Sequence, residues 1–241
     1  MTAAFIEATE NLIAMAADTL SWDANNKPIE VKKAFVLAGR IGVISHGCGP
    51  TGVPSRIENA DIGNDTVEDA AKALAATFRD VTAPYEFGLY VAGFDGDDSK
   101  VWHIDVPSNF PPRRDYTGPG RTLAGWVAPP KMHAAVKTLL TDQLGRLDLV
   151  DDVVNLVRQC YQLDKELIGL EVDYIVIDSR GARLHKVRPR AVNGNVGVRR
   201  HLTLPKDPTD GRECPMVEES KLSDVELNER YNEQRRKFYH A

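Results

Sequence analysis

The sequence is poor in cysteine, has no long apolar run and carries no excess of positive charge. Its three cysteines, Cys48, Cys160 and Cys214, include no CxxC pair. This pattern argues against a disulfide framework and a structural zinc site, and it is typical of reduced thiols in the cytoplasm. No segment approaches the roughly eighteen apolar residues of a membrane helix, and no signal peptide precedes Thr2. We therefore expect a cytoplasmic protein without a membrane partner or a bound metal.

The charge balance bears on the partners of the protein. The formal net charge is -5, which argues against a general nucleic-acid-binding protein, because such proteins contact phosphates with an excess of Lys and Arg. The 241 residues are 42% hydrophobic and 27% charged, which is an ordinary globular composition. A chain of this length has enough apolar material for one substantial core.

The first eighteen residues are the most informative stretch. Residues 3–8 and 12–17 are two short apolar runs, separated by the polar residues Glu10 and Asn11. This pattern predicts a β-hairpin whose second strand ends at Asp18. Such a hairpin would bring Asp18 back beside Thr2.

Thr2 carries chemistry that an internal threonine lacks. If Met1 is removed, Thr2 has a hydroxyl nucleophile and a free α-amine, and the amine's usual pKa of about 7.7–8.0 suits a base at neutral pH. A threonine activated by its own amine is a known form of hydroxyl-nucleophile catalysis. Many soluble proteins also begin with Met-Thr before an edge strand, so the dipeptide alone does not establish catalysis.

Periodicity along the rest of the chain indicates both helices and strands. Apolar residues recur at helical spacing in 66–79, 131–144 and 149–163, which predicts three amphipathic helices. Short apolar runs predict strands over 31–37 and 40–45, and hairpins over 86–106 and 172–187. Periodicity alone therefore indicates a mixed α and β protein.

Four motifs in register resemble the mature β subunit of proteasomes. The first is the run from Thr2 to an Ala-Ala-Asp sequence ending at Asp18, and the second is VKKA at residues 31–34. The third is IGVISHG at 41–47, similar to the strand that leads to the family's oxyanion-hole glycine. The fourth is LYVAGFD at 89–95 followed by VWHID at 101–105. On these motifs the chain is identified as a divergent bacterial or archaeal member of the proteasome β-subunit-like N-terminal-nucleophile (Ntn) hydrolase family.

This resemblance implies a four-layer αββα sandwich of the α+β class. It also implies a threonine-type endopeptidase that needs no cofactor. Thr2 would attack the amide carbonyl, Lys33 would lower the pKa of the threonine hydroxyl, and Asp18 would hold Lys33 charged. The Gly47 N–H would stabilise the oxyanion, and Asp164 would complete the catalytic set.

Three further positions match residues that line the substrate pocket in the family, namely Val31, Ser45 and Gly49. Small and apolar groups there would suit a bulky apolar side chain of a peptide or an unfolded protein. Lys32 is the alternative to Lys33, because only one of two successive residues in a strand can face the site.

Two serines of the family pattern are missing. The stretch Gly118-Pro119-Gly120-Arg121 lacks the serine of a Gly-Ser-Gly motif, and the stretch after Asp164 lacks a second serine. In the family both serines organise the terminal amine and its water. Two alternatives therefore stay open: an Ntn amidohydrolase for small amides, and a non-catalytic ring or scaffold subunit of the same fold.

The expected organisation is a catalytic domain followed by an arm. Residues 2–204 would form the Ntn-hydrolase domain, and residues 205–241 would form a C-terminal extension that ends in a helix. In the family, subunits associate so that their sites face an enclosed or restricted space. We expect a homo-oligomer of at least about six subunits, with the arm touching a neighbour, because a repeated head-to-tail contact gives a ring or an open spiral. Ring, spiral and any ATPase partner stay open.

Overall fold

The computed structural model describes residues 2–22, 27–49, 52–63, 66–81, 86–106, 113–116, 120–192 and 195–199. Two parts of the sequence interpretation lie outside these residues. One is the C-terminal extension, 205–241, and the other is the pair Gly118 and Pro119 of the motif that lacks a serine.

The N-terminal hairpin lies in the middle of a six-stranded antiparallel sheet. Ala4 pairs with Ala17, and Ala8 pairs with Ile13, so the predicted hairpin is confirmed. The closing hairpin pairs with its second strand, because Val172 lies opposite Asp18. The strand order is β10-β1-β2-β11-β12-β13. The strands are β1 (Ala4–Ala8), β2 (Ile13–Asp18), β10 (Thr122–Val127), β11 (Val172–Asp178), β12 (Gly181–Val192) and β13 (Asn195–Arg199).

A second sheet contains the middle of the chain. It has five strands in the order β5-β6-β7-β8-β9, all antiparallel. They are β5 (Ala34–Leu37), β6 (Ile41–Cys48), β7 (Glu86–Asp95), β8 (Asp98–Val106) and β9 (Arg113–Tyr116). A separate two-stranded ribbon consists of β3 (Leu20–Trp22) and β4 (Pro28–Glu30). The strand predicted over 31–37 begins only at Ala34, so residues 31–33 form an irregular connection.

The helices begin at residues that favour helix starts. The Thr66 hydroxyl accepts a hydrogen bond from Asp69 N at 3.1 Å and caps α2. The Asp148 carboxylate accepts one from Asp151 N at 3.1 Å and caps α4. Each cap satisfies a backbone N–H that the helix itself leaves unpaired. The helices are α1 (Val53–Glu58), α2 (Val67–Thr77), the short 3₁₀ helix η1 (Pro130–Met132), α3 (His133–Gln143) and α4 (Leu149–Leu163).

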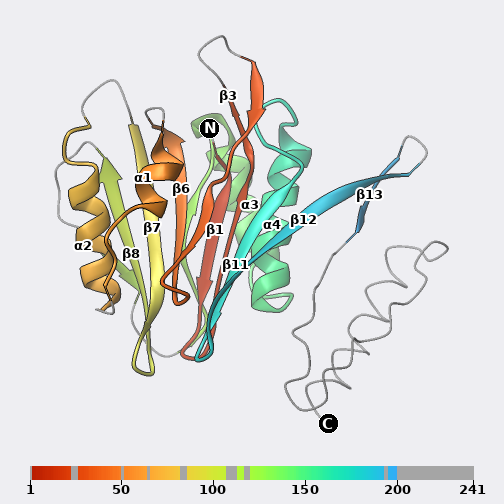
Figure 1. The fold of residues 1–241 in the computed structure, drawn as a ribbon. Helices are drawn as coiled ribbons and strands as arrows, with labels where there is room; N and C mark the ends of the chain where they lie inside the picture. The colour runs from red at the N-terminus through yellow and green to blue at the C-terminus, as the bar shows by residue number, and fades with distance from the viewer. Residues whose placement is uncertain are drawn as a thin grey trace, which may run out of the picture. The chain divides into compact units, whose positions relative to one another are not determined.

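Three clusters of buried apolar side chains hold these elements together. The first joins β1, β2 and β11 to α3 and α4, and the second joins the five-stranded sheet to α1 and α2. The third joins residues of both sheets, among them Ile6, Met15, Ile44 and Val101. Figure 1 shows α3 and α4 beside the six-stranded sheet and α2 beside β7 and β8. The α+β class expected from the sequence is confirmed.

The two sheets approach closely at Gly42. A side-chain carbon at this position would lie 2.8 Å from Ile177 Cδ1 and 3.0 Å from Met15 Sδ. Burial of a large side chain such as Met15 stabilises the fold by about 1.5–3 kcal/mol. A glycine is needed here because the apolar groups of the facing sheet fill the space that a β-carbon would occupy.

Candidate active site

Asp18 is the centre of a buried polar cluster at the end of β2. Its Oδ1 accepts hydrogen bonds from Ala3 N at 2.9 Å and from Lys33 Nζ at 3.1 Å. Its Oδ2 accepts hydrogen bonds from Leu20 N at 3.1 Å and from Gly169 N at 3.0 Å. The side chain is fully buried. One carboxylate therefore connects the N-terminal strand, the ribbon, the Lys33 side chain and the loop after α4.

Lys33, not Lys32, is the lysine that the structure places at this carboxylate. Lys33 is 4% exposed, and its ammonium also donates to the Leu20 carbonyl at 2.5 Å. Burial lowers the pKa of Lys33, and the negative charge of Asp18 opposes that shift. Lys32 is exposed and pairs instead with Glu58 at 2.5 Å. The two side chains diverge on an irregular segment, so strand alternation alone could not have decided between them.

Thr2 is buried beside this cluster. It is 2% exposed, and among the described residues its hydroxyl has no hydrogen-bond partner. Its neighbour Ala3 donates to the Asp18 carboxylate and accepts a hydrogen bond from the Asp18 backbone N–H at 3.1 Å. A buried hydroxyl without a partner costs about 1–3 kcal/mol. An unpaired nucleophilic group one residue from a buried Lys–Asp pair is a feature of functional sites.

Asp164 lies at the start of the loop whose Gly169 contacts Asp18. No hydrogen bond or ion pair joins Asp164 to Thr2 or Lys33 among the described residues. It ends α4, and its Oδ1 accepts from Glu166 N and from Leu167 N, each at 3.1 Å. Its Oδ2 pairs with Lys131 at 2.6 Å, and that hydrogen bond holds the pKa of the carboxyl below its usual range. The loop that Asp164 shapes continues to Gly169, which reaches Asp18. A catalytic role for Asp164 stays a prediction.

Gly47 lies near the end of β6 in a conformation that favours glycine. Its φ is 84°, and it pairs with Phe87 of β7. Residues with a β-carbon rarely adopt a positive φ in a strand. The Ser45 backbone N–H donates to the Lys33 carbonyl at 2.8 Å, so β6 runs directly beside the lysine. The oxyanion role of Gly47 stays a prediction.

One of the three predicted substrate residues, Val31, lines a pocket between the segment 30–32 and the hairpin of β11 and β12. This pocket has a volume of about 460 Å³, and its described lining includes neither Ser45 nor Gly49. Gly49 packs closely instead on α1 and β7, since a β-carbon there would lie 2.8 Å from Val53 Cγ2 and 3.3 Å from Phe87. Whether Ser45 and Gly49 bind substrate stays a prediction.

Sequence reasoning missed two groups at the site. One is Gly169, which has no side chain to block its approach: a β-carbon there would lie 2.8 Å from Leu20 N. The other is His46, whose Nε2 lies 3.1 Å from His103 Nε2. Burial, with the charges of His103 and Lys33, lowers the pKa of His46 to about 3. The sequence offered a signal for each group. Gly169 ends the stretch after Asp164 in which the family's second serine is missing, and His46 directly precedes Gly47.

The described residues contain neither a membrane-spanning helix nor a cluster of metal ligands. No helix in this part of the chain has the length and apolar character to span a membrane. No group of three or more His, Cys, Asp or Glu side chains among the same residues is arranged to hold a metal ion.

Comparison with known proteins identifies structural relatives only. No protein-family model and no curated protein sequence matches this chain. Among solved structures, it is similar to Anbu (ancestral beta-subunit) from Yersinia bercovieri, with a TM-score of 0.58 and 14% identity over 77% of this chain and 86% of that one. It is also similar to Anbu from Hyphomicrobium sp. strain MC1, with a TM-score of 0.55 and 15% identity over 77% of this chain and 87% of that one.

These findings correct the family expected from the sequence motifs. The similar structures are Anbu proteins, and neither a family model nor a sequence relative supports a proteasome β subunit of the Ntn-hydrolase family. The four motifs therefore gave a wrong family assignment, and at 14–15% identity the chain is shown to share the fold of the Anbu proteins.

Proposed function

We propose that this protein hydrolyses amide bonds of peptides, with Thr2 as the nucleophile once Met1 has been removed. The observation that carries this proposal is the buried hydroxyl of Thr2, which has no partner among the described residues and lies one residue before Ala3, whose N–H binds the Asp18 carboxylate of the Asp18–Lys33 ion pair. A nucleophile, a neighbouring cation and a carboxylate that orients the cation are the elements of an activated hydroxyl.

The proposed reaction has two steps. The Thr2 hydroxyl oxygen attacks the amide carbonyl, and the α-amine of the same residue accepts the hydroxyl proton. The C–N bond then breaks, the amine product leaves with that proton, and the remaining ester of Thr2 is hydrolysed by water. Lys33 favours the developing alkoxide by its positive charge, and Asp18 fixes the position of Lys33. A donor such as the Gly47 N–H would stabilise the oxyanion by about 2.7–4 kcal/mol.

The proposal extends to the architecture and the assembly. The three apolar clusters support a four-layer αββα sandwich within residues 2–204. The name "ancestral beta-subunit" describes the Yersinia protein as a subunit, which supports an oligomer. We propose a homo-oligomer, closed or spiral, in the cytoplasm. Light scattering tests the assembly, because a stable monomer at micromolar concentration contradicts it. Removal of the arm, 205–241, should lower the mass if the arm bridges subunits.

A panel of fluorogenic peptides and small amides tests the activity. Thr2→Ala should abolish hydrolysis, and Lys33→Ala should nearly abolish it. Lys32→Ala is the matched control, because Lys32 contacts Glu58 and not Asp18, and it should retain most of the activity. Equal hydrolysis by wild type and Thr2→Ala would contradict the proposal. Hydrolysis of the small amides alone would assign the amidohydrolase alternative.

One observation favours a second candidate, a non-catalytic scaffold subunit. Thr2 is only 2% exposed, and a nucleophile that substrate cannot reach does not react. The scaffold predicts a purified protein that keeps Met1 and is silent toward every peptide in the panel. The hydrolase predicts a protein that begins at Thr2, because removal of Met1 creates the α-amine that accepts the hydroxyl proton.

A further inference from the structure

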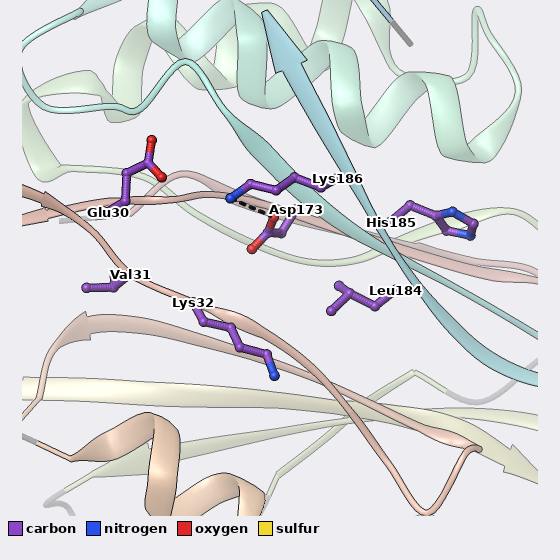
Figure 2. Close-up of a pocket in the computed structure, with 7 residues that line it drawn as sticks. All are labelled: Glu30, Val31, Lys32, Asp173, Leu184, His185 and Lys186. Carbon is purple, nitrogen blue, oxygen red and sulfur yellow. Dashed lines mark ion pairs between the residues drawn. The ribbon is translucent and has the colours of Figure 1, made fainter. Parts of the chain in front are cut away.

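The pocket that contains Val31 has an unusual charge arrangement. Figure 2 shows Glu30, Val31 and Lys32 along one segment, with Asp173, Leu184 and Lys186 on the strands across from it. Asp173 of β11 pairs directly with Lys186 of β12, and Ile175 pairs with Leu184, so these side chains share one face of the sheet. The volume of about 460 Å³ lies within the roughly 300–1,000 Å³ of ligand pockets.

Asp173 is a buried carboxylate with almost no partner. It is 6% exposed, and no hydrogen bond from the described residues reaches it. Its one ion pair, to Lys186, is loose at 4.0 Å and is the dashed line in Figure 2. A buried carboxylate is costly unless donors compensate it. The side chain lines the pocket, so a ligand can supply the missing donor.

The two lysines of the pocket are already engaged elsewhere. Lys32 pairs with Glu58 at 2.5 Å, and Lys186 pairs with Glu171 at 2.7 Å. Glu30 is exposed, and none of the described residues forms an ion pair with it. The charges left uncompensated in the pocket are therefore negative, those of Asp173 and Glu30. This excess of negative charge favours a cationic ligand over a neutral or anionic one.

We propose that the pocket binds an ammonium or guanidinium group on an aliphatic stem, with the cation on Asp173 and the stem between Val31 and Leu184. The cation replaces the missing donors, and a charged hydrogen bond of this kind is among the stronger ones in proteins. Val31 and Leu184 cover the methylene groups, which gain by leaving water. Free alkylamines and the basic side chains of peptides share this chemistry.

The pocket adjoins the candidate active site. Asp173 pairs with Ala17, the residue before Asp18, and Val31 N donates to the Thr19 carbonyl at 2.8 Å. Burial lowers the pKa of Lys33, and the negative charge of Asp173, like that of Asp18, opposes this shift. As a substrate preference for basic side chains, the inference rests on the proposed function. As a binding site, it is tested without hydrolysis.

The charge of Asp173 also predicts how binding depends on pH. Burial raises the pKa of this carboxyl above its usual range, so cation affinity should increase as pH rises and the carboxyl loses its proton. Neighbouring groups contribute to the same titration: Glu171, Lys186 and His185 from the β11–β12 hairpin, and Glu30, Lys32 and Lys33 from the segment opposite.

The test is calorimetric titration of the Thr2→Ala protein, which cannot turn over its ligand. N-acetyl-lysine methylamide is the probe, and the norleucine analogue, which lacks the ammonium, is the matched control. We expect the lysine compound to bind about tenfold or more tightly, and Asp173→Asn to remove that difference. Asp98→Asn changes the net charge equally on the β7–β8 turn and should have no effect.

Equal affinity for the two compounds, or full retention of the difference in Asp173→Asn, would overturn the proposal. The comparison of the two compounds in the Thr2→Ala protein stands even if the variant that also carries Asp173→Asn does not fold. Butylamine and an acetylated Ala-Lys-Ala peptide separate the two sources. Tighter binding of the peptide assigns peptide side chains, and equal binding assigns free amines. Because Thr2→Ala is used throughout, loss of catalysis and loss of binding remain distinguishable.

Discussion

Substitution of Asp18 by alanine should be among the most damaging changes in the described structure. It removes the acceptor of three backbone N–H groups, those of Ala3, Leu20 and Gly169, and of the Lys33 ammonium. A buried donor without a partner costs about 1–3 kcal/mol, and loss of one partner of a buried ion pair costs about 3–5 kcal/mol. Water can enter the space left by the Asp18 carboxylate and bind some of these donors, so the separate costs do not add fully. We expect a loss of about 4–6 kcal/mol.

Such a loss is close to the whole stability of many domains, which is about 5–15 kcal/mol. Urea unfolding followed by circular dichroism measures it. Lys33→Met should cost less, because Asp18 keeps its three backbone donors in that variant. The double variant should lose clearly less stability than the sum of the two single variants, because each single variant leaves the other charge buried without its partner. A cost below about 1 kcal/mol for Asp18→Ala would show that the pair behaves as an exposed one and would refute the reasoning.

Two further predictions follow from buried groups. Burial raises the pKa of Glu7 from 4.5 to about 7, so between these pH values the folded protein holds a proton that the unfolded chain has lost. The free energy of unfolding should therefore fall as pH rises from about 4.5 to 7. Urea unfolding at several pH values measures this slope, and Glu7→Gln should flatten it. If Glu7→Gln left the pH dependence of stability unchanged, that dependence would come from another group. Burial also raises the pKa of Cys160 to about 12, so iodoacetamide at pH 8 should leave Cys160 unmodified in the native protein and alkylate it in urea, as mapped by peptide mass. Alkylation in the native state at the rate of the unfolded chain would contradict the buried position.

The sequence was sufficient for local structure. The two short apolar runs on either side of Glu10 and Asn11 predicted the first hairpin, and the Ala4–Ala17 pairing places Asp18 beside Ala3. The helical spacing of apolar residues predicted a helix over 66–79, and α2 follows Thr66, whose hydroxyl caps it. These features depend on neighbours within a few residues, which pattern reasoning can read.

The site depended on contacts that pattern reasoning does not reach. Gly169 donates its backbone N–H to Asp18 across 151 positions, and local spacing does not predict a contact between residues so far apart in the chain. The choice between Lys32 and Lys33 depended on an irregular segment where alternation does not apply. The sequence pattern placed Asp173 in a strand but did not predict that its carboxylate is buried. The pairing of β11 with β12 places this carboxylate in the pocket. Motif spacing predicted that Asp18 and Lys33 lie together, and they do, yet the same motifs assigned the wrong family.

The most direct test of the central claim is the intact mass of the purified protein before and after incubation with an acylating electrophile. The account predicts a chain that begins at Thr2 and gains one acyl group on that residue, as located by peptide mass spectrometry. Thr2→Ala should stay unmodified, and Lys33→Ala should react far more slowly than Lys32→Ala. A chain that retains Met1, or an acyl group that appears equally in Thr2→Ala, would contradict Thr2 as the nucleophile.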